Sequence, residues 1–330
     1  MKILKSRPLI HFHNREAYLG FWDRIFLRGE IRELGFYRRM FDEDFSSIFH
    51  YSNRRSGTLF DVTTNDEEVT ERLLASIDTG YGPHGSDQTI LKWVEEIAES
   101  LIWSGKAYYY LLDASDSDRI RISPFGPRGV LTFLSVTIQW VPRLTERHWD
   151  REDEEKPREV RILDGQKVLC FTMPKKLRQI LRSQNKTLAT LDRYQYETTK
   201  FLPQATHEDP NPMSHFDFKV WSDNQDRALY RATRQTGWNG RKHDGAKRSD
   251  FFDCHRQIRF RRNQILLRDD ILRQIGSELT RVGREYGAEY SLRIAPTDAL
   301  PQVEQLDDLE SRLMREDASF TEVIDFCLKA

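Results

Sequence analysis

The chain has 330 residues, a formal net charge of −1 from 51 basic and 52 acidic side chains, and a hydrophobic content of 38%. An aromatic content of 12% excludes an intrinsically disordered chain. Its three cysteines, Cys170, Cys254 and Cys327, are too far apart for a disulfide framework or a cysteine zinc site, and they favour a reducing compartment. No segment approaches the roughly 20 apolar residues of a membrane helix, so we expect a soluble protein that does not contact membranes.

The N-terminal part mixes aromatic and basic residues before its first periodic pattern. Helices are expected at Ala17–Phe26, Ile31–Phe41 and Thr63–Ile77. In the last of these, Val69, Leu73 and Ile77 share one face at helical spacing. A turn-rich loop, Thr79–Ser86, then breaks the pattern.

The clearest predicted element is a helix over Asp87–Trp103. One apolar stripe runs along it, formed by Ile90, Val94, Ile97 and Leu101. Ser86 or Asp87 is a suitable N-cap, and Gly105 suits the left-handed position that ends many helices. A tyrosine-rich strand, Ala107–Leu112, is expected directly afterwards.

A cluster of strands follows in the sequence. They are expected at Arg119–Ser123, within Val130–Val141, and at Glu159–Leu163 and Gln166–Met173. The Asp164-Gly165 pair between the last two runs predicts a β-hairpin. Pro174 ends the last strand and opens a predicted helix over Lys175–Phe201.

The remaining third is expected to be mainly helical. Three prolines in Pro203–Pro212 mark a domain boundary. Beyond it we predict a strand at Phe216–Trp221, helices at Asn224–Gln235 and Ile265–Tyr286, a strand at Tyr290–Ala295 and two final helices. Ser319 and Glu322 have the spacing of a capping box at the start of the last helix.

These elements predict an α+β fold of antiparallel strands with flanking helices, followed by a mainly helical C-terminal region. The corresponding division is an α+β domain over 1–202, a linker over 203–215 and a basic, mainly helical domain over 216–330.

The basic segment, Arg227–Arg268, carries twelve basic and three acidic residues, a surplus of nine positive charges. Arginine side chains bind phosphates in a bidentate manner and aromatic rings stack on bases, so this segment is a candidate nucleic-acid contact. The candidate contact residues are Arg241, Lys242, Lys247, Arg248, Arg256, Arg259, Arg261 and Arg262. The alternatives are a solvated face, or an intersubunit surface that meets the acidic stretch Asp298–Asp325.

No residue pattern dictates a chemical reaction. Asp217-Phe218-Lys219 has the D-x-K spacing of some metal-dependent nucleases, but a pair of solvent-facing strand residues explains it better. His11 and His13 lie two residues apart, yet no second pair with metal-ligand spacing supports them. We predict no catalytic residue, no metal and no cofactor.

One junction resembles a known family. Leu101–Tyr108 (LIWSGKAY) is similar to the helix-to-strand junction of tailed-phage portal proteins, where an apolar helix ends in a small-residue turn and enters a strand of the wing domain. Lys106 stands where that family usually has asparagine. The segment Lys167–Pro174 and the ending Leu306–Cys327 also resemble portal segments in the same order. The resemblance covers residues 60–201 and the tail, and it implies a wing-like domain in a ring-forming subunit whose channel passes DNA.

The sequence therefore predicts a non-enzymatic, oligomeric structural protein, portal-like and of phage or mobile-element origin. Its expected partners are nucleic acid, with DNA favoured, and further copies of itself or other subunits. Its expected location is the cytoplasm or a virion. Two alternatives remain: a nuclease or defence-type effector acting through residues 216–268, and a subunit that joins a complex through its opposed charge patches.

Overall fold

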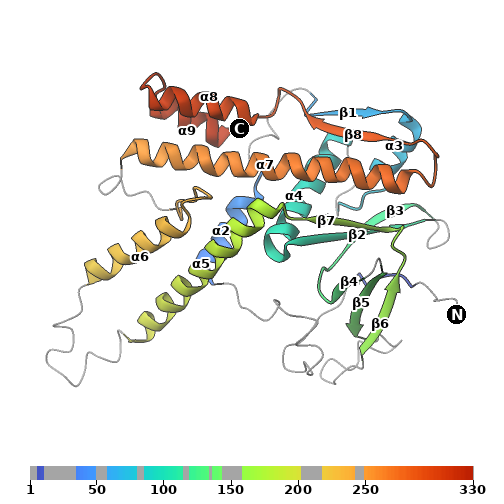
Figure 1. The fold of residues 1–330 in the computed structure, drawn as a ribbon, viewed down its shortest axis with the longest axis horizontal. Helices are drawn as coiled ribbons and strands as arrows, with labels where there is room; N and C mark the ends of the chain where they lie inside the picture. Colours follow the sequence, from blue (N-terminus) through green and yellow to red (C-terminus); the bar gives the residue numbers. More distant parts are fainter. Residues whose placement is uncertain are drawn as a thin grey trace. The chain divides into compact units, whose positions relative to one another are not determined.

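The structure is a computed structural model. It describes residues 6–10, 35–49, 58–79, 85–113, 119–133, 136–142, 158–201, 218–241 and 249–329, and Figure 1 shows their helices and strands. These residues group into two compact units. Unit 1 holds the described residues of 1–32, 60–172 and 271–295, and unit 2 holds those of 33–59, 173–270 and 296–330.

The two units interleave along the chain, unlike the predicted division into 1–202 and 216–330. The predicted linker at 203–215 lies outside the described residues. The boundary of independently folding domains therefore stays a prediction.

Helix α4 (Ser86–Ser104) is the centre of unit 1. Ile90, Trp93, Val94 and Ile97 are fully buried on it. The predicted helix and its stop are confirmed, since Gly105 has φ +78° and its N–H donates to the Leu101 carbonyl at 2.8 Å. The predicted N-cap is wrong: Gly85 occupies that position without a side-chain hydrogen bond, and Ser86 is already helical.

Strand β2 (Lys106–Leu112) follows Gly105 at once and becomes the middle of a three-stranded antiparallel sheet. Its neighbours are β3 (Arg121–Phe125) and β7 (Val168–Thr172). The Trp93 ring of α4 meets Tyr109 and Phe171 edge-on, with ring centroids 5.5 and 5.7 Å apart. Aromatic packing of this kind joins the helix to the sheet.

A second three-stranded antiparallel sheet has the order β4-β5-β6. Its strands are β4 (Val130–Phe133), β5 (Val136–Pro142) and β6 (Arg158–Leu163). Gln139 is fully buried on β5, and its side chain exchanges two hydrogen bonds with the backbone of Leu9, at 2.7 and 2.9 Å. The backbone segment at Leu9 therefore belongs to unit 1.

The predicted hairpin at Asp164-Gly165 is wrong, although both flanking strands exist. β6 pairs with β5 and β7 pairs with β2, so the chain passes from one sheet to the other. Gly165 lacks the positive φ that a two-residue hairpin turn requires. Instead, the Asp164 carboxylate accepts the Gln166 N–H at 3.2 Å, and its carbonyl accepts the N–H groups of Lys167 and Val168.

The predicted helix at Thr63–Ile77 is confirmed only in part. Residues Phe60–Thr64 form strand β1, which pairs with β8 (Leu292–Pro296), and the helix α3 spans Glu67–Ala75. The β-branched residues before Asn65 favour a strand. Asp66 then caps the helix by accepting the Val69 N–H at 3.0 Å.

Unit 2 is mainly helical. It contains α2 (Phe36–Ser46), α5 (Lys175–Phe201), α6 (Phe218–Ala232), the part of α7 (Asp250–Gly283) up to residue 270, α8 (Val303–Met314) and α9 (Phe320–Lys329). A core cluster joins the last three helices, formed by residues such as Cys254, Ile258, Leu306, Leu309 and Val323. In Figure 1, α8 and α9 lie along α7.

The predicted fold class, α+β with a mainly helical C-terminal region, is confirmed. The strand predicted at Phe216–Trp221 is wrong, because Phe218–Trp221 form the first turn of α6. Helix α7 also begins at Asp250 instead of Ile265. Within the described residues, no helix is long and apolar enough to span a membrane.

Candidate functional site

The predicted nucleic-acid contacts begin in the turn after α6, where Arg241 pairs with the acidic end of α2. Its guanidinium contacts the Asp44 carboxylate at 2.6 Å and the Glu43 carboxylate at 3.0 Å. Asp44 also accepts the indole N–H of Trp238 at 2.7 Å. These hydrogen bonds and charges raise the pKa of Arg241 above its ordinary value, Asp44 contributing most. Lys242, Lys247 and Arg248 lie outside the described residues.

Arg256 is only 6% exposed, although its sequence neighbours suggested a surface position. Its guanidinium donates to the Tyr230 carbonyl at 3.3 Å, to the Thr233 hydroxyl at 2.5 Å and to the Trp238 carbonyl. The same group lies 5.3 Å from the centre of the Tyr230 ring, within cation–π range. Arg256 thus ties α7 to the C-terminal end of α6 and the turn after it.

The turn approaches α7 closely at Gly237. Its φ is +85°, and a Cβ there would come within 2.2 Å of the Arg256 carbonyl oxygen. Only glycine fits this position without moving the backbone of one of the two segments.

Arg261 and Gln264 both donate hydrogen bonds to carbonyl groups at the C-terminal end of α2. Arg261, 5% exposed, donates to the Ile48 carbonyl at 2.7 Å. Gln264 donates to the carbonyls of Asp44 and Ser47 at 2.9 and 3.2 Å. The last carbonyls of a helix have no partner within the helix, and its C-terminal end attracts positive charge. Arg261 therefore acts as a buried cap.

Arg262 meets the acidic C-terminal stretch within the same unit. Its guanidinium lies 2.6 Å from the carboxylates of both Asp307 and Glu310 on α8. His255 approaches the second oxygen of Glu310 at 3.1 Å. Burial lowers the pKa of His255 and the neighbouring Arg259 adds to this, while Glu310 opposes it. The pairing predicted as an intersubunit alternative occurs here inside one chain.

Arg259 is half-buried and donates to the Arg234 carbonyl at 2.9 Å. All five predicted contact residues that the structure describes therefore have an intramolecular hydrogen-bond partner. Their binding to nucleic acid stays a prediction. A run of basic residues does not show in the sequence which of them face inward, because the buried arginines replace apolar residues in the periodic pattern.

The structure does not support the strand position that the nuclease hypothesis needs for its D-x-K pattern. Phe218 and Lys219 begin helix α6, so these two residues do not lie on the strand that a D-x-K site requires, and Asp217 is outside the described residues. Among the described residues, no group of three or more His, Cys, Asp or Glu side chains is placed to hold a metal ion. His11 and His13 fall outside that range.

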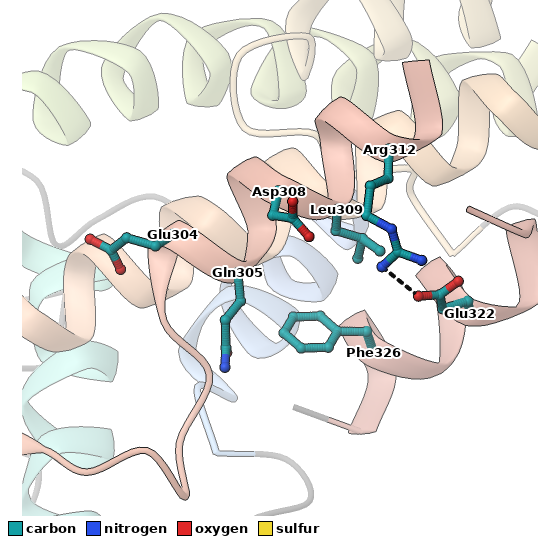
Figure 2. Close-up of a pocket in the computed structure, with 7 residues that line it drawn as sticks. All are labelled: Glu304, Gln305, Asp308, Leu309, Arg312, Glu322 and Phe326. Carbon is teal, nitrogen blue, oxygen red and sulfur yellow. Dashed lines mark ion pairs between the residues drawn. The ribbon is translucent and has the colours of Figure 1, made fainter. Parts of the chain in front are cut away.

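A groove between α8 and α9, which sequence reasoning missed, has a volume of about 410 Å³ (Figure 2). Leu309 and Phe326 form its apolar part, and Glu304 and Asp308 line it from α8. Arg312 and Glu322 close one side through an ion pair of 2.8 Å. The groove combines apolar and acidic surface.

Large apolar side chains are exposed on the same two helices. Met314, at the end of α8, is 62% exposed, and Phe320 and Ile324 of α9 are 41% and 40% exposed. Val323 and Cys327 of α9 point into the core. Thr321, Glu322 and Asp325 form the polar side of this helix, and Phe320 and Ile324 lie between that side and the core.

No family model matches the sequence, and no curated protein matches it either. The chain is similar to chains of gene transfer agent (GTA) particles. One is from a neck of the empty GTA particle computed with C6 symmetry, with 12% identity, 98% of this chain and 95% of that chain covered, and a TM-score of 0.43. A chain of the virion of the native particle is 11% identical, with 95% of this chain and 91% of that chain covered and a TM-score of 0.40. A chain of the native neck computed with C12 symmetry is 10% identical, with 88% of each chain covered and a TM-score of 0.40.

Identities and scores this low do not carry a function from one chain to another.

Proposed function

We propose that the chain is a non-enzymatic, portal-like structural subunit of a phage-type or mobile-element particle, that it assembles into an oligomer, and that it works in contact with DNA. The observation that carries this proposal is the exposed apolar face of α9. The apolar stripe of a surface helix is normally covered by the protein's own core. Phe320 and Ile324, at the edge of the apolar stripe of α9, stay about 40% exposed in the single chain, and an assembly would cover them.

Phe320 and Ile324 are one helical turn apart and therefore share a face. With about 40% of each side chain exposed, they form a joint apolar surface. Isolated apolar residues are ordinary on protein surfaces, whereas grouped ones mark contact sites. The exposed Met314 and the groove beside α9 extend the surface available to a partner.

The local structure around α4 and β2 supports a portal-like subunit. The junction that resembles portal proteins, Leu101–Tyr108, forms a buried helix, a left-handed glycine stop and a buried central strand in immediate succession. The helix α5 follows the last strand of that sheet after only Met173 and Pro174. We place the protein in a virion, or in the cytoplasm before assembly. Lys242, Lys247 and Arg248 stay candidates for DNA contact.

The test replaces the apolar face by polar residues that keep helix propensity. We expect the full chain to form an oligomer in light scattering, and Phe320→Gln with Ile324→Gln to shift the mass toward the monomer. The matched control is Phe36→Gln with Trp103→Gln, which removes side chains 61% and 48% exposed on other helices. It should leave the mass unchanged.

Circular dichroism and the melting temperature of the variants separate lost assembly from lost folding. An oligomer that survives the Phe320/Ile324 variant intact would contradict the assignment of this face. A wild-type chain that is monomeric at every concentration would contradict the proposed function itself.

A further inference from the structure

The exposed side of α5 carries a row of positive charges, and this row lies outside the basic segment, Arg227–Arg268. Five basic side chains of this helix are exposed and lie on one side: Lys175, Arg178, Arg182, Lys186 and Arg193. At about 100° per residue they fall within about 80° of the helix circumference. At about 1.5 Å per residue they span about 27 Å along the axis.

The buried face of α5 lies on nearly the opposite side. It consists of Leu177, Leu181, Gln184, Leu188 and Leu191. These residues pack into unit 2, so the basic row is directed away from the core that holds the helix.

No acidic side chain neutralises the row within the part of the chain that the structure describes. None of its five members has an ion pair with a described carboxylate, and Arg178 makes only a hydrogen bond of 3.1 Å to the Met173 carbonyl. The only acid between Lys175 and Arg193 is Asp192. Its two oxygens accept the backbone N–H groups of Tyr37 and Arg38, at 2.8 and 3.4 Å, at the start of α2.

This contrasts with the basic segment. Arg241 and Arg262 are paired with carboxylates, and Arg256 and Arg261 are buried against carbonyl groups. Unlike these four arginines, the cations of the α5 row are both exposed and without an ion pair to a described carboxylate.

We propose that the basic row of α5 binds the phosphate backbone of duplex DNA without reading its sequence. Protein interfaces have an apolar, desolvated centre, and the row contains only small or polar residues beside its cations, such as Gln179, Ala189 and Thr190. Backbone binding needs charge along a line and no apolar centre, since it is driven by release of counterions from the phosphates. The inference rests on the proposed function and names the surface that meets DNA.

The experiment measures binding of the full chain to a fluorescent 20-base-pair duplex of arbitrary sequence over a range of salt concentrations. The variant combines Arg178→Gln, Arg182→Gln and Lys186→Gln, which keep helix propensity. Loss of three phosphate contacts should reduce the steepness of log K against log salt by about 2.7 and weaken binding about tenfold or more at low salt. A duplex of scrambled sequence should behave identically.

Two controls bracket the result. Arg178→Lys with Arg182→Lys and Lys186→Arg keeps the charges and should bind like the wild type. Arg284→Gln with Arg293→Gln and Arg315→Gln removes three exposed cations elsewhere and should retain the steep salt dependence.

Light scattering on the same samples distinguishes the two proposals. Wild-type DNA binding by the α5 variant overturns the α5 assignment, and a normal oligomer in that sample leaves the proposed function standing. Loss of DNA binding in a variant of Lys242, Lys247 and Arg248, with the α5 variant unaffected, would return the contact to the basic segment. A change of oligomer mass without a change of DNA binding would make the row a subunit contact and overturn the inference.

Discussion

Glu96 shows how strongly burial acts on a single side chain of this protein. It lies on α4 beside the Tyr109 hydroxyl, and burial raises its pKa to about 7, with the negative charge of Asp78 adding to the shift. An unfolded chain would bind this proton only below its ordinary pKa of 4.5. The folded state therefore holds more protons between these values, and stability falls as the pH rises through them.

We expect Glu96→Gln to remove this dependence. The variant should be more stable than the wild type at pH 8, by about 2 kcal/mol, and the two should converge below pH 4.5. Urea unfolding at a series of pH values measures this, with Glu99→Gln on the exposed side of α4 as the control. A variant that is equally or less stable at pH 8 would show that the Glu96 carboxylate is not destabilising.

At the scale of the element, the end of α2 depends on a distant helix. The carbonyls of Asp44, Ser47 and Ile48 receive hydrogen bonds from Arg261 and Gln264 of α7. Arg261→Met fills similar space but leaves the Ile48 carbonyl without this donor. It should lower the free energy of unfolding by about 2–3 kcal/mol.

The control for that cap is Arg315→Met, at an exposed position after α8. It should change stability by less than about 0.5 kcal/mol. Equal unfolding free energies for the two variants, measured in urea, would refute the capping role of Arg261.

The same scale shows what the sequence could predict. Helix α5 has its predicted bounds, and α4 differs by one residue at each end, because Pro174 and Gly105 are local signals that also hold in the fold. The prediction of an Asp164-Gly165 hairpin was wrong because strand pairing depends on which strands meet in space. β6 pairs with β5, and β7 pairs with β2. The first half of α7 was missed because Arg256 and Arg261 occupy its buried positions.

For the whole molecule, the fold class and a family resemblance could be predicted from the sequence, whereas the exposed surfaces could be identified only in the structure. Charge counting singled out the basic segment, whose described contact residues are buried or hydrogen-bonded within the chain. The row on α5 and the exposed apolar residues of α9 lie on helices that the sequence predicted, but their exposure could be identified only in the structure. Burial and pairing, which sequence alone does not contain, decide which charges face a partner.

The central claim is that this chain is a subunit of an assembly. The most direct test is the mass of the purified full-length protein in dilute solution, by mass photometry or light scattering. The account predicts a closed particle of defined mass, a whole-number multiple of the 39.1 kDa chain. A single species at the mass of one chain, unchanged over a hundredfold range of concentration, would contradict it.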